Sequence, residues 1–221
     1  MVIKLYDIDN KKYLFDVKKP IDRGHTGLVY KIDDDTCLKY TTSYRLHQWY
    51  TLSKLMELNL DNFYKIYKIL FDSNGDYSGY LMKYYQNELI DILTMPTEYT
   101  LDNFYRLSNT VNKISNNEIV MYDLHDGNVI MNKNDIIIID ADFYDEEYTS
   151  NIEKIKIDNY ELLLYLFKDL YKINLEEHFT NYTEEYRVIL DLFSKNENIY
   201  QKLKDYKYPI DYIKSKTKKK Q

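Results

Sequence analysis

The sequence predicts an α+β protein in which a small antiparallel sheet comes first and a mostly helical part follows. In residues 22 to 84, strand-like runs alternate with short polar turns. Farther along the chain, residues 100 to 115 and 158 to 170 carry apolar side chains at helical spacing. One helical pattern, at residues 43 to 58, interrupts the strand-like part.

Turn residues position the predicted strands. Asp33, Asp34 and Asp35 form a turn after which the run ending at Lys39 closes a first hairpin. A second hairpin joins residues 64–71 to residues 79–84 through a turn that mixes Asp, Ser, Asn and Gly.

Three helices are predicted from apolar periodicity. The first covers residues 43–58, the second begins at Thr100 as its N-cap, and the third covers residues 158–170. Asp158 either caps this third helix or anchors the backbone of a loop elsewhere. The apolar stripe of the first helix consists of Leu46, Trp49, Tyr50, Leu52, Leu55 and Met56.

Residues 121 to 140 carry the candidate chemistry. Asp123 precedes Asn128 by five positions, an apolar hairpin follows, and Asp140 ends its returning strand. Phosphoryl transfer requires a carboxylate to orient the attacking hydroxyl, and amide and carboxylate oxygens to hold Mg²⁺ on the nucleotide phosphates. Asp123 is the candidate base, and Asn128 and Asp140 are candidate metal ligands. Asp142 is either a further metal ligand or a capping carboxylate.

A glycine-rich segment lies nearer the N-terminus. In the kinase loop G-x-G-x-x-G-x-V, the second and third glycines and the valine correspond to Gly24, Gly27 and Val29. Asp22 stands in place of the first glycine, where its carboxylate either repels phosphate or caps the turn. Glycine suits positions where the backbone approaches a ligand closely.

Lys39 and Cys37 occupy a strand that matches the V-A-I-K segment of kinases. Lys39 would hold the α and β phosphates of a nucleotide. Cys37 lies on the same strand face, because side chains two positions apart share a face, and it could contact the adenine.

With these motifs in this order, the chain resembles a small, atypical member of the protein-kinase-like superfamily over roughly residues 15 to 170. The loop at 123–128 is similar to the D-x-H-x-x-N loop of aminoglycoside and choline phosphotransferases. In that loop His125 would either orient the loop or sit near phosphate, and we expect a structural hydrogen bond. The resemblance implies a two-lobed fold, with an N-lobe at 1–83, a helical C-lobe at 84–213 and a basic flexible tail at 214–221. It also implies that the backbone near Lys83 and Tyr85 meets the adenine.

The function that this resemblance implies is an ATP- and Mg²⁺-dependent phosphotransferase acting on a hydroxyl of a small molecule or protein. Asp123, Lys39, Asn128 and Asp140 would form its catalytic set. The alternative is a weak or inactive pseudokinase that binds a nucleotide or a protein, because the helix at 43–58 lacks a Glu placed to pair with Lys39.

The spacing from the following predicted strand puts that pairing position near Gln48 or Thr51. Glu57, the glutamate that this helix does contain, lies near its C-terminal end. A lysine without a carboxylate partner would be poorly positioned.

Composition restricts the binding partners and the cellular compartment that we expect for this protein. A net charge of −6 argues against nucleic-acid binding, which needs a basic face. The single cysteine excludes a disulfide within the chain and suits a reducing cytoplasm. No apolar run approaches the ~20 residues needed to span a bilayer, so no membrane span is expected.

Overall fold

The computed structural model describes residues 2–41, 48–86, 97–132, 134–146 and 151–171. The chain divides into two compact units. The first consists of Met1–Asn59, Tyr64–Gln86 and Asp140–Tyr144, and the second of Leu60–Phe63, Asn87–Ile139 and Asp145–Gln221. The proposed lobe boundaries stay predictions, and the basic tail lies outside the described residues. No helix in the described ranges is long and apolar enough to cross a membrane.

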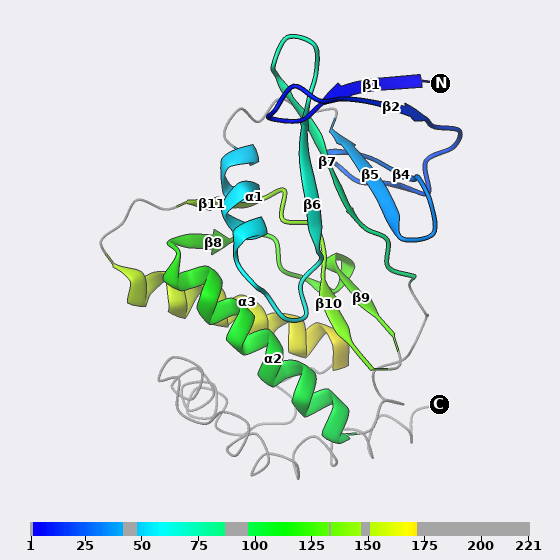
Figure 1. Ribbon diagram of the computed structural model, residues 1–221. Helices are drawn as coiled ribbons and strands as arrows, with labels where there is room; N and C mark the ends of the chain where they lie inside the picture. The colour runs from blue at the N-terminus through cyan, green and yellow to red at the C-terminus, as the bar shows by residue number, and fades with distance from the viewer. Residues whose placement is uncertain (1, 42–47, 87–96, 133, 147–150, 172–221) are drawn as a thin grey trace, which may run out of the picture. The chain divides into compact units, whose positions relative to one another are not determined.

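A seven-stranded antiparallel sheet with the order β2-β1-β6-β7-β5-β4-β3 forms the first unit (Figure 1). Both predicted hairpins are present, although β6 begins two residues later and β7 two residues earlier than predicted. The strands are β1 (Val2–Tyr6), β2 (Lys12–Asp16), β3 (Asp22–Arg23), β4 (Gly27–Lys31), β5 (Thr36–Thr41), β6 (Ile66–Phe71) and β7 (Tyr77–Lys83).

Aspartates hold the turns of this sheet. Asp7, Asp33 and Asp72 each begin a hairpin turn, and each carboxylate accepts a hydrogen bond from the backbone N–H two residues farther on, at 3.0, 2.9 and 2.7 Å respectively. Such Asx turns let the side chain replace a backbone acceptor. The acidic turns in the sequence therefore specify the hairpins directly.

Helix α1 (Gln48–Glu57) packs against β6 of the same unit. Leu52 and Leu55 are buried as the apolar stripe predicts, but Tyr50 is 51% and Met56 39% exposed, so the predicted stripe is too wide. Leu46 lies outside the described residues. The strands share one apolar cluster made of Ile3, Leu5, Phe15, Val17, Tyr30, Leu38 and Leu70.

The second unit contains two long helices and short strands (Figure 1). Helix α2 begins three residues before Thr100, so the predicted N-cap is wrong, and α3 begins six residues before Asp158. The two helices pack against each other. The elements are α2 (Thr97–Asn116), β8 (Ile119–Met121), the 3₁₀ turn η2 (Asp126–Asn128), β9 (Val129–Met131), β10 (Ile136–Ile138), β11 (Tyr144–Glu146) and α3 (Ile152–Tyr171).

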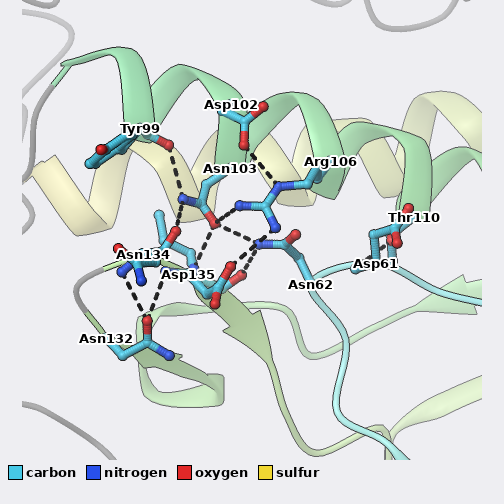
Figure 2. Close-up of polar contacts among 11 residues, drawn as sticks. Asp61, Asn62, Tyr99, Asp102, Asn103, Arg106, Thr110, Asn132, Asn134 and Asp135 are labelled. Atoms are coloured by element: carbon cyan, nitrogen blue, oxygen red, sulfur yellow. Dashed lines mark hydrogen bonds and ion pairs between the residues drawn. The ribbon is translucent and has the colours of Figure 1, made fainter.

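A buried asparagine fastens α2 to the β9–β10 hairpin. The Asn103 Oδ1 accepts hydrogen bonds from the Asn62 amide at 2.6 Å and from the N–H of Ile136 at 2.8 Å (Figure 2). Its Nδ2 donates to the carbonyls of Tyr99 and Asn134 at 2.9 and 2.8 Å. The hairpin that follows Asn128 is therefore held from its turn as well as by its own strand pairing.

Candidate functional site

Lys39 lies in a row of side chains that crosses the sheet of the first unit. In register, Ile69 faces Tyr80, Tyr80 faces Lys39, Lys39 faces Val29, and Val29 faces Asp22. Residues directly opposite each other in antiparallel strands project to the same side. The lysine and the predicted glycine-rich segment therefore share one face of the sheet.

Two carboxylates bind the Lys39 ammonium. Its Nζ lies 2.6 Å from Oδ1 of Asp140 and 2.7 Å from Oδ2 of Asp142, and the residue is 3% exposed. Burial lowers the pKa of Lys39, but the charges of Asp142 and Asp140 outweigh burial, so that its pKa lies above the ordinary value. Lys39 is therefore a fixed, charged donor, with carboxylate partners that the sequence motifs did not predict.

Asp142 is the more enclosed of the two partners. Its side chain is 2% exposed, and Oδ2 accepts from both Lys39 and the Thr26 hydroxyl. The Tyr80 hydroxyl donates to Oδ1 at 3.3 Å. Burial raises the pKa of Asp142, while the charge of Lys39 opposes that effect. Both oxygens thus already have donors from the protein.

Two buried tyrosines extend this network. The Ala141 N–H donates to the Tyr64 hydroxyl at 3.2 Å, and Tyr64 in turn donates to Tyr80 at 3.3 Å. Burial, followed by the negative charge of Asp142, raises the pKa of both phenols well above the ordinary value. They therefore act as neutral hydrogen-bonding groups behind Asp142.

Asp140 differs from Asp142 in exposure and in backbone conformation. Its side chain is 27% exposed, and its φ of 62° lies in the left-handed region. Residues other than glycine seldom adopt that conformation, and such positions concentrate at functional sites. Asp140 is thus the carboxylate of the pair with a surface open to a further ligand.

The glycine-rich segment forms the hairpin of β3 and β4. The Gly24 N–H donates to the Gly27 carbonyl at 3.0 Å across the turn. A Cβ on Gly27 would lie 2.4 Å from the Tyr40 carbonyl oxygen, whereas one on Gly24 would meet nothing closer than 4.0 Å. Asp22 is exposed in β3, and its carboxylate accepts the N–H of the adjacent Arg23 at 2.8 Å.

Cys37 lies beside the segment predicted to meet adenine. Its buried Sγ is 3.8 Å from the carbonyl oxygens of Met82 and Lys83, and burial raises its pKa to about 12. The Lys83 N–H donates to the Lys65 carbonyl at 2.8 Å, and the Tyr85 hydroxyl accepts from the Lys65 N–H at 3.3 Å. The Lys83 N–H is therefore already paired with a backbone carbonyl of the same unit.

In the second unit, hydrogen bonds orient the predicted catalytic loop. The Asn128 Nδ2 donates to the carbonyl oxygen of Asp123 at 2.8 Å and to its Oδ2 at 3.0 Å. Since both partners are acceptors, the amide must present its nitrogen to Asp123, which leaves Oδ1 for another ligand. The predicted structural bond of His125 is confirmed, because its Nδ1 accepts the N–H of Gly127 at 3.0 Å.

Asn159 anchors the strand that leads into this loop. Its Oδ1 accepts the N–H of Met121 at 2.8 Å, and its Nδ2 donates at 2.9 Å to both the Ser115 hydroxyl and the Ile119 carbonyl. Both interpretations of Asp158 are therefore wrong: it lies inside α3, and the neighbouring asparagine makes the anchor. An amide can donate and accept at once, which a carboxylate cannot do.

Each unit contains a side-chain oxygen of the type that Mg²⁺ prefers. Among the described residues, no three His, Cys, Asp or Glu side chains gather closely enough to hold a metal ion. Mg²⁺ commonly takes only one or two protein oxygens and completes its shell with water and phosphate. Taken separately, Asn128 Oδ1 in the second unit and the partly exposed Asp140 carboxylate in the first are oxygen donors of this type.

No protein-family model and no curated protein matches the sequence. Among solved structures, the chain is similar to the kinase PK-1 of Cydia pomonella granulovirus, with a TM-score of 0.53 and 15% sequence identity over 72% of this chain and 69% of that one. At this low identity, the similarity is evidence of the fold alone. The predicted α+β class is confirmed. The chain therefore has a protein-kinase-like fold.

Proposed function

We propose that the protein is an ATP- and Mg²⁺-dependent phosphotransferase that moves the γ-phosphoryl group to a hydroxyl on a small molecule or a protein. The observation that carries the proposal is the pair of hydrogen bonds from Asn128 Nδ2 to Asp123. They hold a carboxylate and an amide oxygen in one short loop, which is the pair that a base and a metal ligand require.

Asp123 is the proposed base. Its side chain is 37% exposed, and one carboxylate oxygen is held by Asn128. The other lies 3.5 Å from the His125 Nε2. Such a carboxylate can accept the proton of an acceptor hydroxyl while its own orientation stays constant.

The nucleotide phosphates would be held by Lys39 and by the segment from Gly24 to Gly27, and Mg²⁺ by Asn128 and Asp140. The metal supplies charge neutralisation on the transferred phosphoryl group. Lys39 contributes a permanently charged donor, because its carboxylate partners raise its pKa. The adenine would contact Val29, Cys37 and the backbone at Lys83 and Tyr85.

The first test is thermal unfolding with ATP plus Mg²⁺, ATP alone and Mg²⁺ alone, because ligands that bind the native state raise its midpoint. We expect a Mg²⁺-dependent ATP shift that is lost in Asp140→Asn. Asparagine tolerates the left-handed backbone of this position, so this change removes charge without adding strain. An ATP shift that keeps its Mg²⁺ dependence in Asp140→Asn would remove Asp140 from the metal site.

The second test concerns turnover. Asp123→Asn should lower kcat by about 10²–10⁴, the usual contribution of a positioned base, while nucleotide binding persists. Asp126→Asn is the matched control, because this exposed neighbour lies in the same loop. Equal turnover in the two variants would contradict the role of Asp123.

A pseudokinase remains the second candidate, favoured by Asp22. This exposed carboxylate stands opposite Val29, where the kinase loop has glycine, and it adds negative charge to the segment proposed to hold phosphate. In that case Asp22→Gly would strengthen nucleotide binding, and the wild-type protein would show no turnover with any hydroxyl acceptor tested.

A further inference from the structure

The charge partner of Lys39 comes from an unexpected part of the chain. In α1, the residues nearest the predicted pairing position are uncharged: Gln48 is 6% and Thr51 2% exposed. Both side-chain polar atoms of Gln48 are buried without a hydrogen-bond partner. The helix therefore supplies no carboxylate at this position, whereas Asp140 and Asp142 both reach the ammonium.

The two carboxylates are not equivalent. Asp142 is 2% exposed and accepts from Lys39, Thr26 and Tyr80. Turning it away would strand the buried hydroxyls of Thr26 and Tyr80 and leave Lys39 with Asp140 as its only carboxylate partner among the described residues. Asp140 is 27% exposed, and Lys39 is the only side chain of the described residues that forms an ion pair with it. One carboxylate is thus fixed to the lysine, and the other can serve a second ligand.

The geometry points to Asp142 as the permanent counterion that positions Lys39 in place of a helix carboxylate. Through the Thr26 hydroxyl, the same carboxylate also holds the glycine-rich segment. This inference rests on the proposed function, for which both elements hold phosphate. Asp142 is a positioning residue, because it acts through Lys39 and Thr26.

A lysine positioned in this way would not be regulated through α1. In this protein the lysine would be set by a residue two positions after Asp140 rather than by α1. A displacement of α1 would then leave the Lys39 ion pair intact, and nucleotide affinity would not depend on Gln48.

The test compares the MgATP dissociation constant, KM and kcat of Asp142→Asn, Gln48→Leu and the wild type. We expect Asp142→Asn to weaken MgATP binding by about tenfold or more, as loss of a buried charge-assisted contact does, with Mg²⁺ dependence retained. Gln48→Leu should bind within about twofold of the wild type, since the change removes an unpaired amide. In a double-mutant cycle, Asp142→Asn should add little once Lys39→Met is present.

Further variants separate positioning from folding. Thr26→Val should weaken MgATP binding, and Thr26→Ser, which keeps the hydroxyl, should restore it. Asp7→Asn removes another buried aspartate of the same unit, one that pairs with Lys68 at 2.9 Å, and should lower stability without affecting nucleotide binding. Unchanged MgATP affinity in Asp142→Asn, or an unchanged ATP affinity with lost Mg²⁺ dependence, would overturn the inference.

A measurement without nucleotide keeps the two proposals distinguishable. Acetic anhydride acetylates accessible lysines, and peptide mass spectrometry can follow the acetylation of Lys39 with the exposed Lys12 as the internal reference. Acetylation of Lys39 should be slow in the wild type and several-fold faster in Asp142→Asn. Equal rates would refute the pairing even if MgATP binds. If MgATP does not bind the wild type, the proposed function fails, and the acetylation rates still decide whether Asp142 positions Lys39.

Discussion

Two backbone positions beside β5 exclude any side chain. A Cβ on Gly27 would lie 2.4 Å from the Tyr40 carbonyl oxygen, and one on Gly79 would lie 2.0 Å from the Lys39 carbonyl oxygen. Gly79 also has a φ of 141°, which side-chain-bearing residues rarely adopt. The strand that carries Lys39 is therefore closely approached from both neighbouring strands, and its place in the sheet depends on both glycines.

Gly27→Ala should destabilise the protein by about 1–3 kcal/mol, because overpacking against backbone atoms forces the strands apart. Gly24→Ala is the control and should change stability by less than about 0.5 kcal/mol, since its Cβ meets no close neighbour. Urea unfolding of both variants measures the difference. Equal stabilities would show that β4 can shift to accommodate a methyl group.

For single residues, roles that depend on a local sequence signal could be predicted, and roles that depend on long-range contacts could not. Asp123 and Asn128 lie five positions apart, and the structure joins them by hydrogen bonds. Asp142 binds Lys39 from more than a hundred residues away, and Asn159 of α3 reaches Met121 of β8. Only folding brings such pairs together, although the repeated Asp at positions 140 and 142 was a usable signal for a second acidic partner.

Among the elements, the β1–β2 hairpin is joined to β6 by an ion pair between a buried aspartate and a half-buried lysine. Asp7 is 4% exposed and accepts from the Lys68 ammonium at 2.9 Å and from the Tyr13 hydroxyl at 3.0 Å. The hydrogen bond from Lys68 is the main cause that lowers the pKa of Asp7 to about 2, against the ordinary 3.8.

A depressed pKa makes this contribution depend on pH. The stabilisation by Asp7 should be complete above pH 3.8 and should be lost as the pH falls towards 2. Asp7→Asn should therefore be less stable than the wild type at pH 7, and the difference should shrink below about pH 4. Urea unfolding between pH 7 and pH 3 measures this. The exposed Asp9→Asn is the control, and a difference that stays constant with pH would contradict the ion-pair explanation.

The attachment of α2 to the rest of its unit depends on the buried Asn103 amide. Asn103→Ala removes five hydrogen bonds of a fully buried amide and should cost on the order of 1–3 kcal/mol or more for the buried groups left unpaired. Asn109→Ala, on the same helix but only half-buried, should be neutral or slightly stabilising because alanine favours helix. Thermal unfolding compares the two. A similar loss in both variants would contradict the role of the Asn103 network, because helix propensity alone favours alanine at both positions.

Element types were easier to predict than element ends. The hairpins follow from aspartates that close the turns through their own carboxylates. Helix α3 starts earlier than its apolar pattern, because its first turns carry charged residues such as Glu153 and Lys156. Helix α3 packs against α2, and this tertiary stabilisation is absent from local periodicity.

For the whole molecule, the acidic composition predicts how the protein behaves in solution. The net charge is −6 and the isoelectric point is about 5.3, so repulsion between copies should be weakest near that pH. Light scattering as a function of pH should show maximal self-association there. Lys18→Gln with Lys19→Gln should move the maximum to lower pH, and an unmoved maximum would point to contacts other than net charge.

The two ends of the sheet also bear on how this tyrosine-rich chain avoids ordered aggregation. An open strand edge can template pairing with another copy. Here β3, at one edge, is only two residues long, and β2, at the other, begins with Lys12 and ends with Asp16, both exposed. Within the described residues, each edge thus carries a feature that natural proteins use to discourage edge-to-edge growth. Replacing Lys12 with an apolar residue should therefore favour fibrils, whereas the contacts of Lys39, which involve no residue of β1 or β2, should stay unchanged.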